Sequence, residues 1–232
     1  GGGLAWLGAS WVERGIDIDS CLFDSNWANR GGGLYLVDAD RTDKIDVKGT
    51  SFIKNSVITS GGGVVANVGS SSGRSIGFYD CYFIENLTMG LIPALQILPN
   101  GMLPFDTIIM HKTTFDKNRV LATTSSINAC VSVDVLGLPN SLIIIKNCQF
   151  ENQDLSNHNS TGLVSIQFDI GMLNFENNTI TNNNCNYRFI NTNGQKINLA
   201  NNKILTNITD GALYLVVQQP NQYLNISDVE CV

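Results

Sequence analysis

The sequence predicts an all-β fold, a right-handed parallel β-helix (a solenoid) of about eight rungs. Three observations predict this fold class: a residue pattern that recurs about every 30 positions, a fixed spacing of apolar residues within each copy, and runs of three glycines in the early copies. A period of this length is typical of solenoids, in which each repeat packs only against its neighbours. We expect rungs this long and uneven to coil with a right hand.

The recurring pattern is clearest around Cys21, which we take as its anchor. Two apolar residues precede the anchor, a turn former stands directly before it, and a large apolar residue and then an amide follow it. In this copy these are Ile16, Ile18, Ser20, Phe23 and Asn26. The later copies have their anchors at Thr50, Cys81, Thr113, Cys148, Asn178, Asn202 and Val229. We number the rungs one to eight after these anchors.

The apolar spacing predicts a strand followed by a bend in each copy. Residues two apart, such as Ile16 and Ile18, point to one face of a strand. The step of three from Ile18 to Cys21 breaks this alternation, so the chain must bend there, at a residue type that favours turns. The expected bend residues are Ser20, Gly49, Asp80, Asn147, Asn177, Asn201 and Asp228.

A further strand closes each rung and follows the run of glycines in the early copies. It carries apolar residues two apart, namely Leu34 and Leu36, Val64 and Ala66, and Leu213 and Leu215. Glycine permits a positive φ or a close backbone approach at the corner before this strand. A phosphate-binding role would require a helix after the glycines, and none is predicted, so we assign them to the corner.

Stacking the rungs places like residues in columns. Strands one rung apart lie about 4.8 Å from each other, so no rung buries its apolar face alone. One expected column is Phe23, Phe52, Phe83, Phe115 and Phe150, and another is Asn26, Asn55, Asn86 and Asn118. An inward amide needs its donors and acceptor satisfied, and we expect the amide of the next rung and the bent backbone to do so.

Length and composition favour one domain, residues 1–232, cut from a longer solenoid. The repeat is unbroken, and Gly1–Leu4 already matches the segment 31–34. The net charge is −6 and 15% of the residues are charged, with no basic stripe to neutralise phosphates, so we expect no nucleic-acid partner. No apolar run is long enough for a membrane-spanning helix, and we expect no cofactor.

Rung four departs from the pattern. Pro93, Pro99 and Pro104 predict an irregular loop between about 90 and 106, because proline cannot donate to a sheet ladder. The register also places Ile109 and Ile144 next to each other on the outside. Exposed apolar residues of this kind are covered either by a loop or by a partner, and we favour the proline loop.

The cysteines are expected to be small core residues. Cys21, Cys81 and Cys148 share a column but lie two rungs apart, a separation of about 9.6 Å that exceeds the reach of a disulfide. Cys185, in a turn-rich stretch, is the candidate exception. No Cys/His spacing fits zinc, so we predict no metal site.

The outward face of the first sheet is where chemistry could take place. Its candidate catalytic residues are Asp17, Asp19, Asp46 and Lys48, and its weaker ligand-binding candidates are Tyr79, Tyr82 and His111. Asp17 and Asp46 stack one rung apart, close enough to perturb a pKa or share a cation, and the tyrosines could support a sugar. The alternative is that these aspartates simply lie on a solvated face. A lyase or an inverting hydrolase needs more carboxylates than these columns supply.

Five Asn-X-Ser/Thr sequons occur, at Asn86, Asn159, Asn177, Asn207 and Asn225. Chance predicts a similar number, so the sequons alone do not indicate secretion. Asn86 and Asn207 fall in the inward amide column, where a glycan does not fit. The candidate glycosylation sites are therefore Asn159, Asn177 and Asn225, with Asn159 the favoured acceptor.

Two motifs alternate over residues 1–118, about half of the chain. Phe-X-X-Asn stands at Phe23–Asn26, Phe52–Asn55, Phe83–Asn86 and Phe115–Asn118, between runs of Gly-Gly-Gly-Leu or Gly-Gly-Gly-Val. This arrangement resembles the repeat of the polymorphic outer membrane protein family. The resemblance implies a right-handed β-helix that is displayed at a surface and is largely adhesive, and it brings no catalytic residues. The later rungs look more like pectin-lyase-type β-helices with asparagine ladders.

Together these observations favour a non-catalytic extracellular or cell-surface β-helix, acting as an adhesin or as a structural or filament element. Its expected partners are a protein or a glycan at a surface. End-to-end self-association is also expected, because open ends carry unpaired strands. The alternative function is a carbohydrate-active enzyme or a sugar-binding module that uses the outward face of the first sheet.

Overall fold

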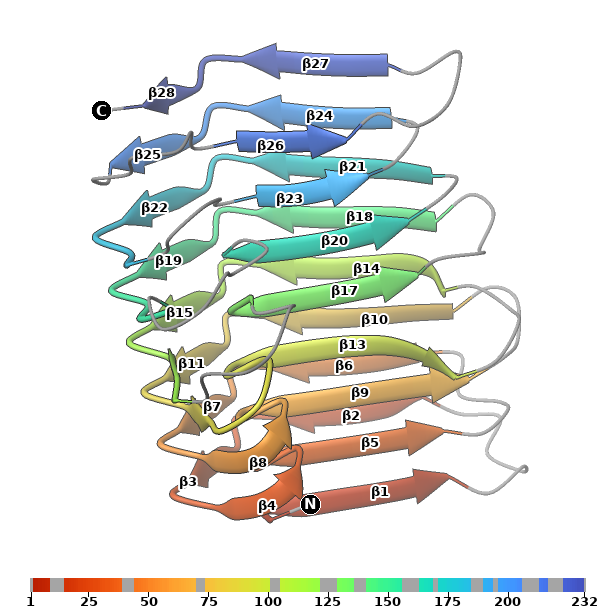
Figure 1. Ribbon diagram of the computed structural model, residues 1–232. Helices are drawn as coiled ribbons and strands as arrows, with labels where there is room; N and C mark the ends of the chain where they lie inside the picture. Colours follow the sequence, from red (N-terminus) through yellow and green to blue (C-terminus); the bar gives the residue numbers. More distant parts are fainter. Residues whose placement is uncertain are drawn as a thin grey trace.

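The chain winds into a parallel β-solenoid, shown in Figure 1. This computed structural model describes residues 2–8, 15–38, 44–69, 74–100, 105–121, 129–135, 141–155, 163–168, 171–184, 190–193, 196–205, 213–216 and 223–231. None of these segments is helical, and strands one rung apart pair in parallel in all four sheets, as β10 (Arg74–Tyr79) does with β6 (Lys44–Lys48). The predicted all-β fold class is confirmed.

Three of the four sheets contain eight strands each. Sheet A consists of β1 (Leu4–Gly8), β5 (Leu34–Asp38), β9 (Val64–Gly69), β13 (Leu95–Asn100), β17 (Val131–Val135), β20 (Val164–Phe168), β23 (Ile190–Asn193) and β26 (Leu213–Val216). Sheet B consists of β2 (Ile16–Asp19), β6, β10, β14 (Phe105–His111), β18 (Ser141–Lys146), β21 (Gly171–Glu176), β24 (Lys196–Ala200) and β27 (Tyr223–Ser227).

The other two sheets form the short sides of the coil. Sheet C consists of β3 (Leu22–Asp24), β7 (Ser51–Ile53), β11 (Tyr82–Ile84), β15 (Thr114–Asp116), β19 (Gln149–Glu151), β22 (Thr179–Thr181), β25 (Lys203–Leu205) and β28 (Glu230–Cys231). Sheet D consists of β4 (Trp27–Arg30), β8 (Ser56–Ser60), β12 (Leu87–Thr88) and β16 (Arg119–Val120).

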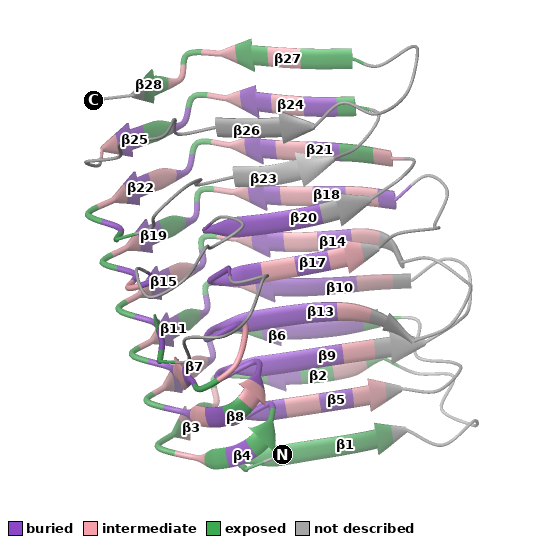
Figure 2. Cartoon of the chain, viewed as in Figure 1, coloured by how far each residue is buried: buried purple, intermediate pink, exposed green. Residues whose placement is uncertain are grey.

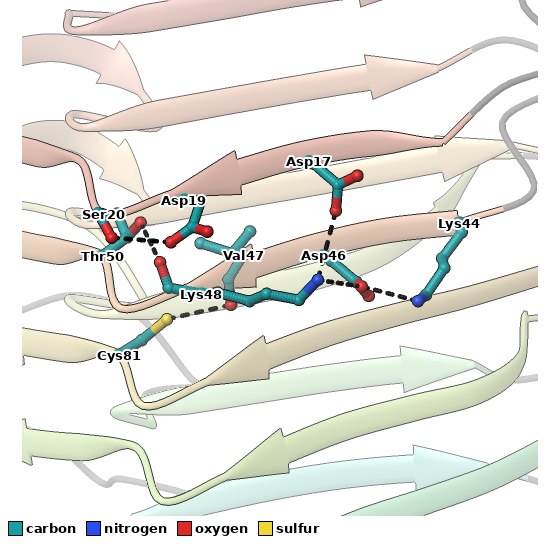
Figure 3. A network of polar contacts seen from close by, with 9 residues as sticks. All are labelled: Asp17, Asp19, Ser20, Lys44, Asp46, Val47, Lys48, Thr50 and Cys81. Atoms are coloured by element: carbon teal, nitrogen blue, oxygen red, sulfur yellow. Dashed lines mark hydrogen bonds and ion pairs between the residues drawn. The ribbon is translucent and has the colours of Figure 1, made fainter.

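The direction of the strands gives the hand of the coil. In Figure 1 the chain rises from the N-terminus, the strands of sheet A run to the right in front, and those of sheet B run to the left behind them. Figure 3, which has sheet B in front, shows the same sense of winding. The coil is therefore right-handed, as predicted.

The predicted phenylalanine column lies in the interior. Phe23, Phe52, Phe83, Phe115 and Phe150 pair in register along sheet C. Their ring centroids are 5.1, 4.8, 4.9 and 4.9 Å apart in that order, and the rings are nearly parallel. Pairs of this kind contribute about 0.5–1.5 kcal/mol beyond the area that they bury, so the column binds each rung to the next. Figure 2 shows the buried positions along the strands.

The predicted asparagine column forms a hydrogen-bonded ladder. The Asn86 amide donates through Nδ2 to the carbonyl oxygen of Phe52 (2.8 Å), and its Oδ1 accepts the backbone N–H of Asn55 (3.0 Å). Asn55 and Asn118 bond the rungs before them in the same way. The ladder continues through Gln153 to Asn183. Each inward amide is thus satisfied by the neighbouring rung, as expected.

Two bends, each with a positive φ, turn the chain between sheets B, C and D. The first bend uses the predicted positions, and φ lies between 51° and 56° at Ser20, Gly49, Asp80, Lys112, Asn147, Asn177, Asn201 and Asp228. The second bend lies at the amide column, where a bend was expected, and φ lies between 52° and 55° at Ser25, Lys54, Glu85, Lys117, Asn152 and Asn182. Each residue of the second bend directly precedes a ladder amide, whose hydrogen bonds fix this otherwise unfavourable backbone conformation.

Close backbone approach explains the glycines at the corner before sheet A. A Cβ added to Gly32 would lie 2.4 Å from the carbonyl oxygen of Gly62, and one added to Gly62 would lie 2.2 Å from that of Pro93. Gly31 and Gly61 also have positive φ values of 57° and 69°. No larger residue fits at these contacts, as the sequence indicated.

The prediction of an irregular proline loop is wrong for residues 95–100, which form strand β13. Pro99 pairs with Val68 of the preceding rung, and Pro93 is buried. On the other side, the pairing of β13 with β17 ends at Ile97, two residues before Pro99. Pro99 has no N–H to donate, but no hydrogen bond between described strands is lost as a result. Residues 101–104, which were expected to cover Ile109 and Ile144, lie outside the described segments.

Candidate functional site

The outward side chains of sheet B lie in columns, as the register predicted. Asp17 pairs with Asp46 and Asp19 with Lys48 on strands β2 and β6. Figure 3 shows Asp17, Asp46 and the two lysines of β6 converging. The Nζ atoms of Lys44 and Lys48 lie 2.7 and 2.9 Å from Oδ2 of Asp46. Lys48 also reaches Oδ1 of Asp17, at 3.5 Å.

Asp46 is buried, which the sequence did not predict. Its exposed fraction is 2%, whereas 75% of the Asp17 side chain is exposed. In the next rung, Gly77 pairs with Asp46, and the Tyr79 ring folds back over this glycine. A Cβ added to Gly77 would lie 2.3 Å from Cε2 of Tyr79. The glycine thus provides the space that the tyrosine ring occupies.

The charges in this cluster stabilise one another. Burial by itself raises the pKa of Asp46, but the hydrogen bonds from Lys44 and Lys48 outweigh burial and hold this pKa below its ordinary value. The hydrogen bond to Asp46 in turn raises the pKa of each lysine. Lys48 is therefore protonated and Asp46 ionised at neutral pH. Neither group has the poised pKa that a general base or acid needs.

One carboxylate oxygen of Asp46 takes no part in these ion pairs. Both lysines bond Oδ2 of Asp46, while its buried Oδ1 has no hydrogen-bond partner among the described residues. Burial, followed by the nearby charge of Asp46, raises the pKa of Tyr79. The tyrosine is thus held neutral beside the carboxylate. This part of the face is an ionic cluster in which lysines pair with both aspartates.

Tyr79, Tyr82 and His111 do not form one platform. Tyr82 is 45% exposed but belongs to strand β11 of sheet C, beyond the bend at Asp80. His111 pairs with Tyr79 along sheet B, and its Nε2 lies 3.1 Å from Nδ2 of Asn147. The structure therefore brings His111 next to Tyr79 and places Tyr82 on another sheet.

The candidate glycosylation sites differ in their surroundings. Asn177 is exposed at the first bend of rung six, with φ 54°. Asn225 is half-buried, and its Nδ2, the atom that a glycan would modify, donates to Oδ1 of Asn198 (2.7 Å). Asn86 is fully buried in the ladder, as expected. Asn159 and Asn207 lie outside the described segments.

The described cysteines are free thiols in or near the core. Cys81, Cys130 and Cys148 are buried and Cys21 is half-buried, in agreement with the prediction. The Sγ atoms of Cys81 and Cys148 donate to the carbonyl oxygens of Val47 (3.3 Å) and Met110 (3.5 Å). Cys185 lies outside the described segments. Within the described segments, no group of three or more His, Cys, Asp or Glu side chains could hold a metal ion.

Two concave surfaces escaped the sequence analysis. The first, which we call the amide hollow, lies on the outside of sheet B and has a volume of about 270 Å³. It is lined by Met172, Asn174, Lys196, Ile197, Asn198, Tyr223 and Asn225. The signal that could have revealed it is the recurrence of asparagine at the same outward position in rungs six, seven and eight.

The second concave surface, the corner groove, follows the outside of the second bend and has a volume of about 580 Å³. It is lined by Lys54, Ser56, Glu85, Leu87, Lys117, Arg119, Asn152 and Asp154. Lys54 and Glu85 form an ion pair across it (3.9 Å). These residues occupy two outward columns of rungs two to five, which the sequence analysis did not follow.

The fold defines the chain as a parallel β-solenoid, and its outward surface carries these two hollows in the described segments. No family model, no curated protein and no solved structure matches it. The described residues include no helix that is long and apolar enough to span a membrane.

Proposed function

We propose that this chain is a non-catalytic β-helix of the cell surface or the extracellular space, acting as an adhesin or as a stiff structural element. The observation that carries the proposal is the ionic cluster of Asp17, Asp46, Lys44 and Lys48. Its acids are paired with lysines of the same and the adjacent rung. A face with fixed, paired charges is suited to contact with a partner surface, because it gives register and specificity to an interface.

The interior supports the structural part of the proposal. Stacked rings and ladder amides tie each of the first five rungs to its neighbour. Most of the recurring side chains are engaged in these contacts. A coil joined in this way at every rung resists bending and serves well as a rod that holds a binding surface away from its point of attachment.

The repeat motifs support the location. Phe-X-X-Asn lies in the ring column and the glycine runs lie at the tight corner, and these are the two motifs that resemble the polymorphic outer membrane protein repeat. We extend the resemblance to surface display and adhesion on this basis. The sequons at Asn177 and Asn225 are compatible with such a location, and glycosylation at the exposed Asn177 is the stronger candidate of the two.

A binding and turnover assay tests the proposal. For binding, purified chain is added to cultured cells and to immobilised extracellular-matrix proteins and glycans. For turnover, the chain is incubated in parallel with a panel of polysaccharides. We expect saturable surface binding without release of reducing ends or unsaturated sugars. Turnover that is lost in the Asp46→Asn and Lys48→Ala variants would overturn the proposal in favour of a carbohydrate-active enzyme. A lack of binding to every surface would overturn the proposed adhesin.

A further inference from the structure

We propose that the amide hollow on β21, β24 and β27 binds a single hexopyranose unit of a glycan. The inference rests on the proposed function in one respect, since it names the class of ligand that an adhesive surface would recognise. The hollow lies four or more rungs away from the ionic cluster on the same sheet. It is therefore a separate site from the residues that the sequence analysis selected.

The walls of the hollow are two columns of outward side chains. Met172, Lys196 and Tyr223 pair in register along one side, and Asn174, Asn198 and Asn225 pair along the other. The floor between the two columns is the main chain at Ile197, whose side chain points inward and is 1% exposed. Regular β-structure thus holds each wall residue in place, which reduces the conformational cost of binding.

The asparagine wall is ordered by a chain of hydrogen bonds. Lys146 pairs with Oε2 of Glu176 (3.2 Å), and Oε1 of Glu176 accepts from Nδ2 of Asn198 (2.8 Å). Oδ1 of Asn198 accepts from Nδ2 of Asn225 (2.7 Å). Both asparagine amides donate toward the earlier rung, so the Oδ1 atom of Asn225 is left as an acceptor without a partner among the described residues. Two of the three amides are therefore oriented before a ligand arrives.

Unused hydrogen-bonding groups remain in the hollow. The amide of Asn174 makes no hydrogen bond to any described residue, and Asn198 and Asn225 each keep a second N–H. An amide presents a donor and an acceptor side by side. Neighbouring hydroxyl groups of a sugar ring, each able to donate and to accept, match this arrangement. The ammonium group of Lys196, which has no ion pair among the described residues, adds a donor on the other wall.

The opposite wall supplies apolar contact. Tyr223 is 61% exposed and Met172 is 37% exposed, and both line the hollow. The C–H-bearing face of a pyranose packs well against an aromatic ring, as apolar groups generally do. A volume of about 270 Å³ is near the lower limit of small-molecule sites and suits one ring of a longer glycan. The combination of free amides with an exposed tyrosine favours a sugar over a protein side chain.

The test is a titration of methyl glycosides of glucose, galactose, mannose, N-acetylglucosamine and glucuronate, followed by saturation-transfer NMR on the 232-residue chain. We expect binding of at least one glycoside, weakened about tenfold by either Asn174→Ala or Tyr223→Ala. Lys196→Ala should weaken glucuronate more than a neutral sugar if the ammonium group pairs with a carboxylate. An unchanged preference would assign Lys196 to hydroxyl groups of a neutral hexose.

Matched controls come from exposed residues outside the hollow. Trp27→Ala removes an aromatic side chain that is 65% exposed on sheet D, and Asn184→Ala removes an exposed amide. Both should leave glycoside binding unchanged, and circular dichroism should show native folding for all five variants. Binding to no glycoside, or binding that the Asn174 and Tyr223 variants retain in full, would overturn the proposal.

The surface-binding assay separates this inference from the proposed function. Cell or matrix binding by a chain that binds no glycoside would overturn the sugar site and leave the adhesive function standing. Glycoside binding by a chain that attaches to no cell or matrix surface would support the sugar site and overturn the adhesive function.

Discussion

Rungs one to five and rungs six and seven bind their neighbours by different means at the first bend. The early rungs carry a thiol or a hydroxyl at the anchor, and rungs six and seven carry an amide. Cys81 donates to the carbonyl oxygen of Val47 (3.3 Å), and Asn178 donates to the equivalent oxygen of Ile145 (3.0 Å). In both cases the acceptor is the last inward residue of sheet B in the preceding rung. A thiol and an amide can thus each supply the donor for this carbonyl oxygen.

The amide adds a second bond that the thiol does not make. Oδ1 of Asn178 accepts the backbone N–H of Cys148 (2.8 Å), and Asn202 does the same for Asn178 (3.0 Å). In the same rungs the ring column ends, because Ile180 and Ile204 replace phenylalanine. The comparison teaches that ring stacking and a second amide ladder are alternative ways to join one rung to the next.

The largest expected effect comes from breaking the early ring column. Phe83→Ala removes the ring that stacks on both Phe52 and Phe115 and leaves a cavity in the core. We expect the free energy of unfolding to fall by about 3–5 kcal/mol. Guanidinium unfolding followed by circular dichroism measures the change. A loss below about 1 kcal/mol would show that the ring column does not hold the early rungs together.

Two further substitutions sharpen this result. Phe83→Leu keeps most of the side-chain volume and should cost less than about 1.5 kcal/mol. Ile180→Phe tests whether the early arrangement can be extended into rung six. Phe175 of sheet B already packs against Phe150 there, with ring centroids 6.3 Å apart. An added ring should therefore overpack the core and cost about 1–3 kcal/mol.

The second effect separates the two kinds of bend. Asn178→Ala leaves the buried N–H of Cys148 and the carbonyl of Ile145 without these partners, and should cost about 2–4 kcal/mol. Thr113→Ala removes one hydroxyl donor, which lies 3.3 Å from the carbonyl oxygens of both Phe78 and His111, and should cost about 1 kcal/mol. The same unfolding measurement compares them. Equal losses would contradict the view that the amide makes the stronger connection.

The third effect concerns the ionic cluster and is smaller. Because the pKa of Asp46 is lowered in the folded chain, its contribution is present above its unfolded pKa of about 4 and is lost as the pH falls through the lower folded value. Asp46→Asn should lower the melting temperature by a few degrees at pH 7 and by less at pH 3. An equal difference in melting temperature between the Asp46→Asn variant and the unmodified chain at pH 7 and pH 3 would contradict this prediction. Asp17→Asn, at an exposed position, is the control.

The smallest effect concerns the thiols of the early bends. Burial raises the pKa of Cys81 to about 11 and that of Cys148 to about 12, so both should react with iodoacetamide at pH 8 at least about a hundredfold more slowly than in the unfolded chain. The half-buried Cys21 should react before them. Mass spectrometry of timed samples measures the order. Early modification of Cys148 would show that its bend opens.

The sequence predicted the interior of this fold better than its surface. The Phe23 and Asn26 columns repeat, and each repeat limits where its neighbours can lie, so the register followed from spacing alone. The burial of Asp46 and the orientation of Tyr79 over Gly77 are local features of one rung, so no repeat indicates them. Pro99 was assigned to a loop because proline cannot donate to a neighbouring strand. The sequence does not show that the pairing of β13 with β17 ends before Pro99.

The ladder amides use main-chain carbonyl oxygens as their acceptors, those of Phe23, Phe52 and Phe83 for Asn55, Asn86 and Asn118 in turn. Every residue has such a carbonyl, so a rung does not depend on the identity of the one beneath it. A recombination event that removed or duplicated one whole period would leave the new junction bonded as before. Coils of this kind can therefore gain or lose height in evolution without compensating substitutions, and the surface that they display changes with them.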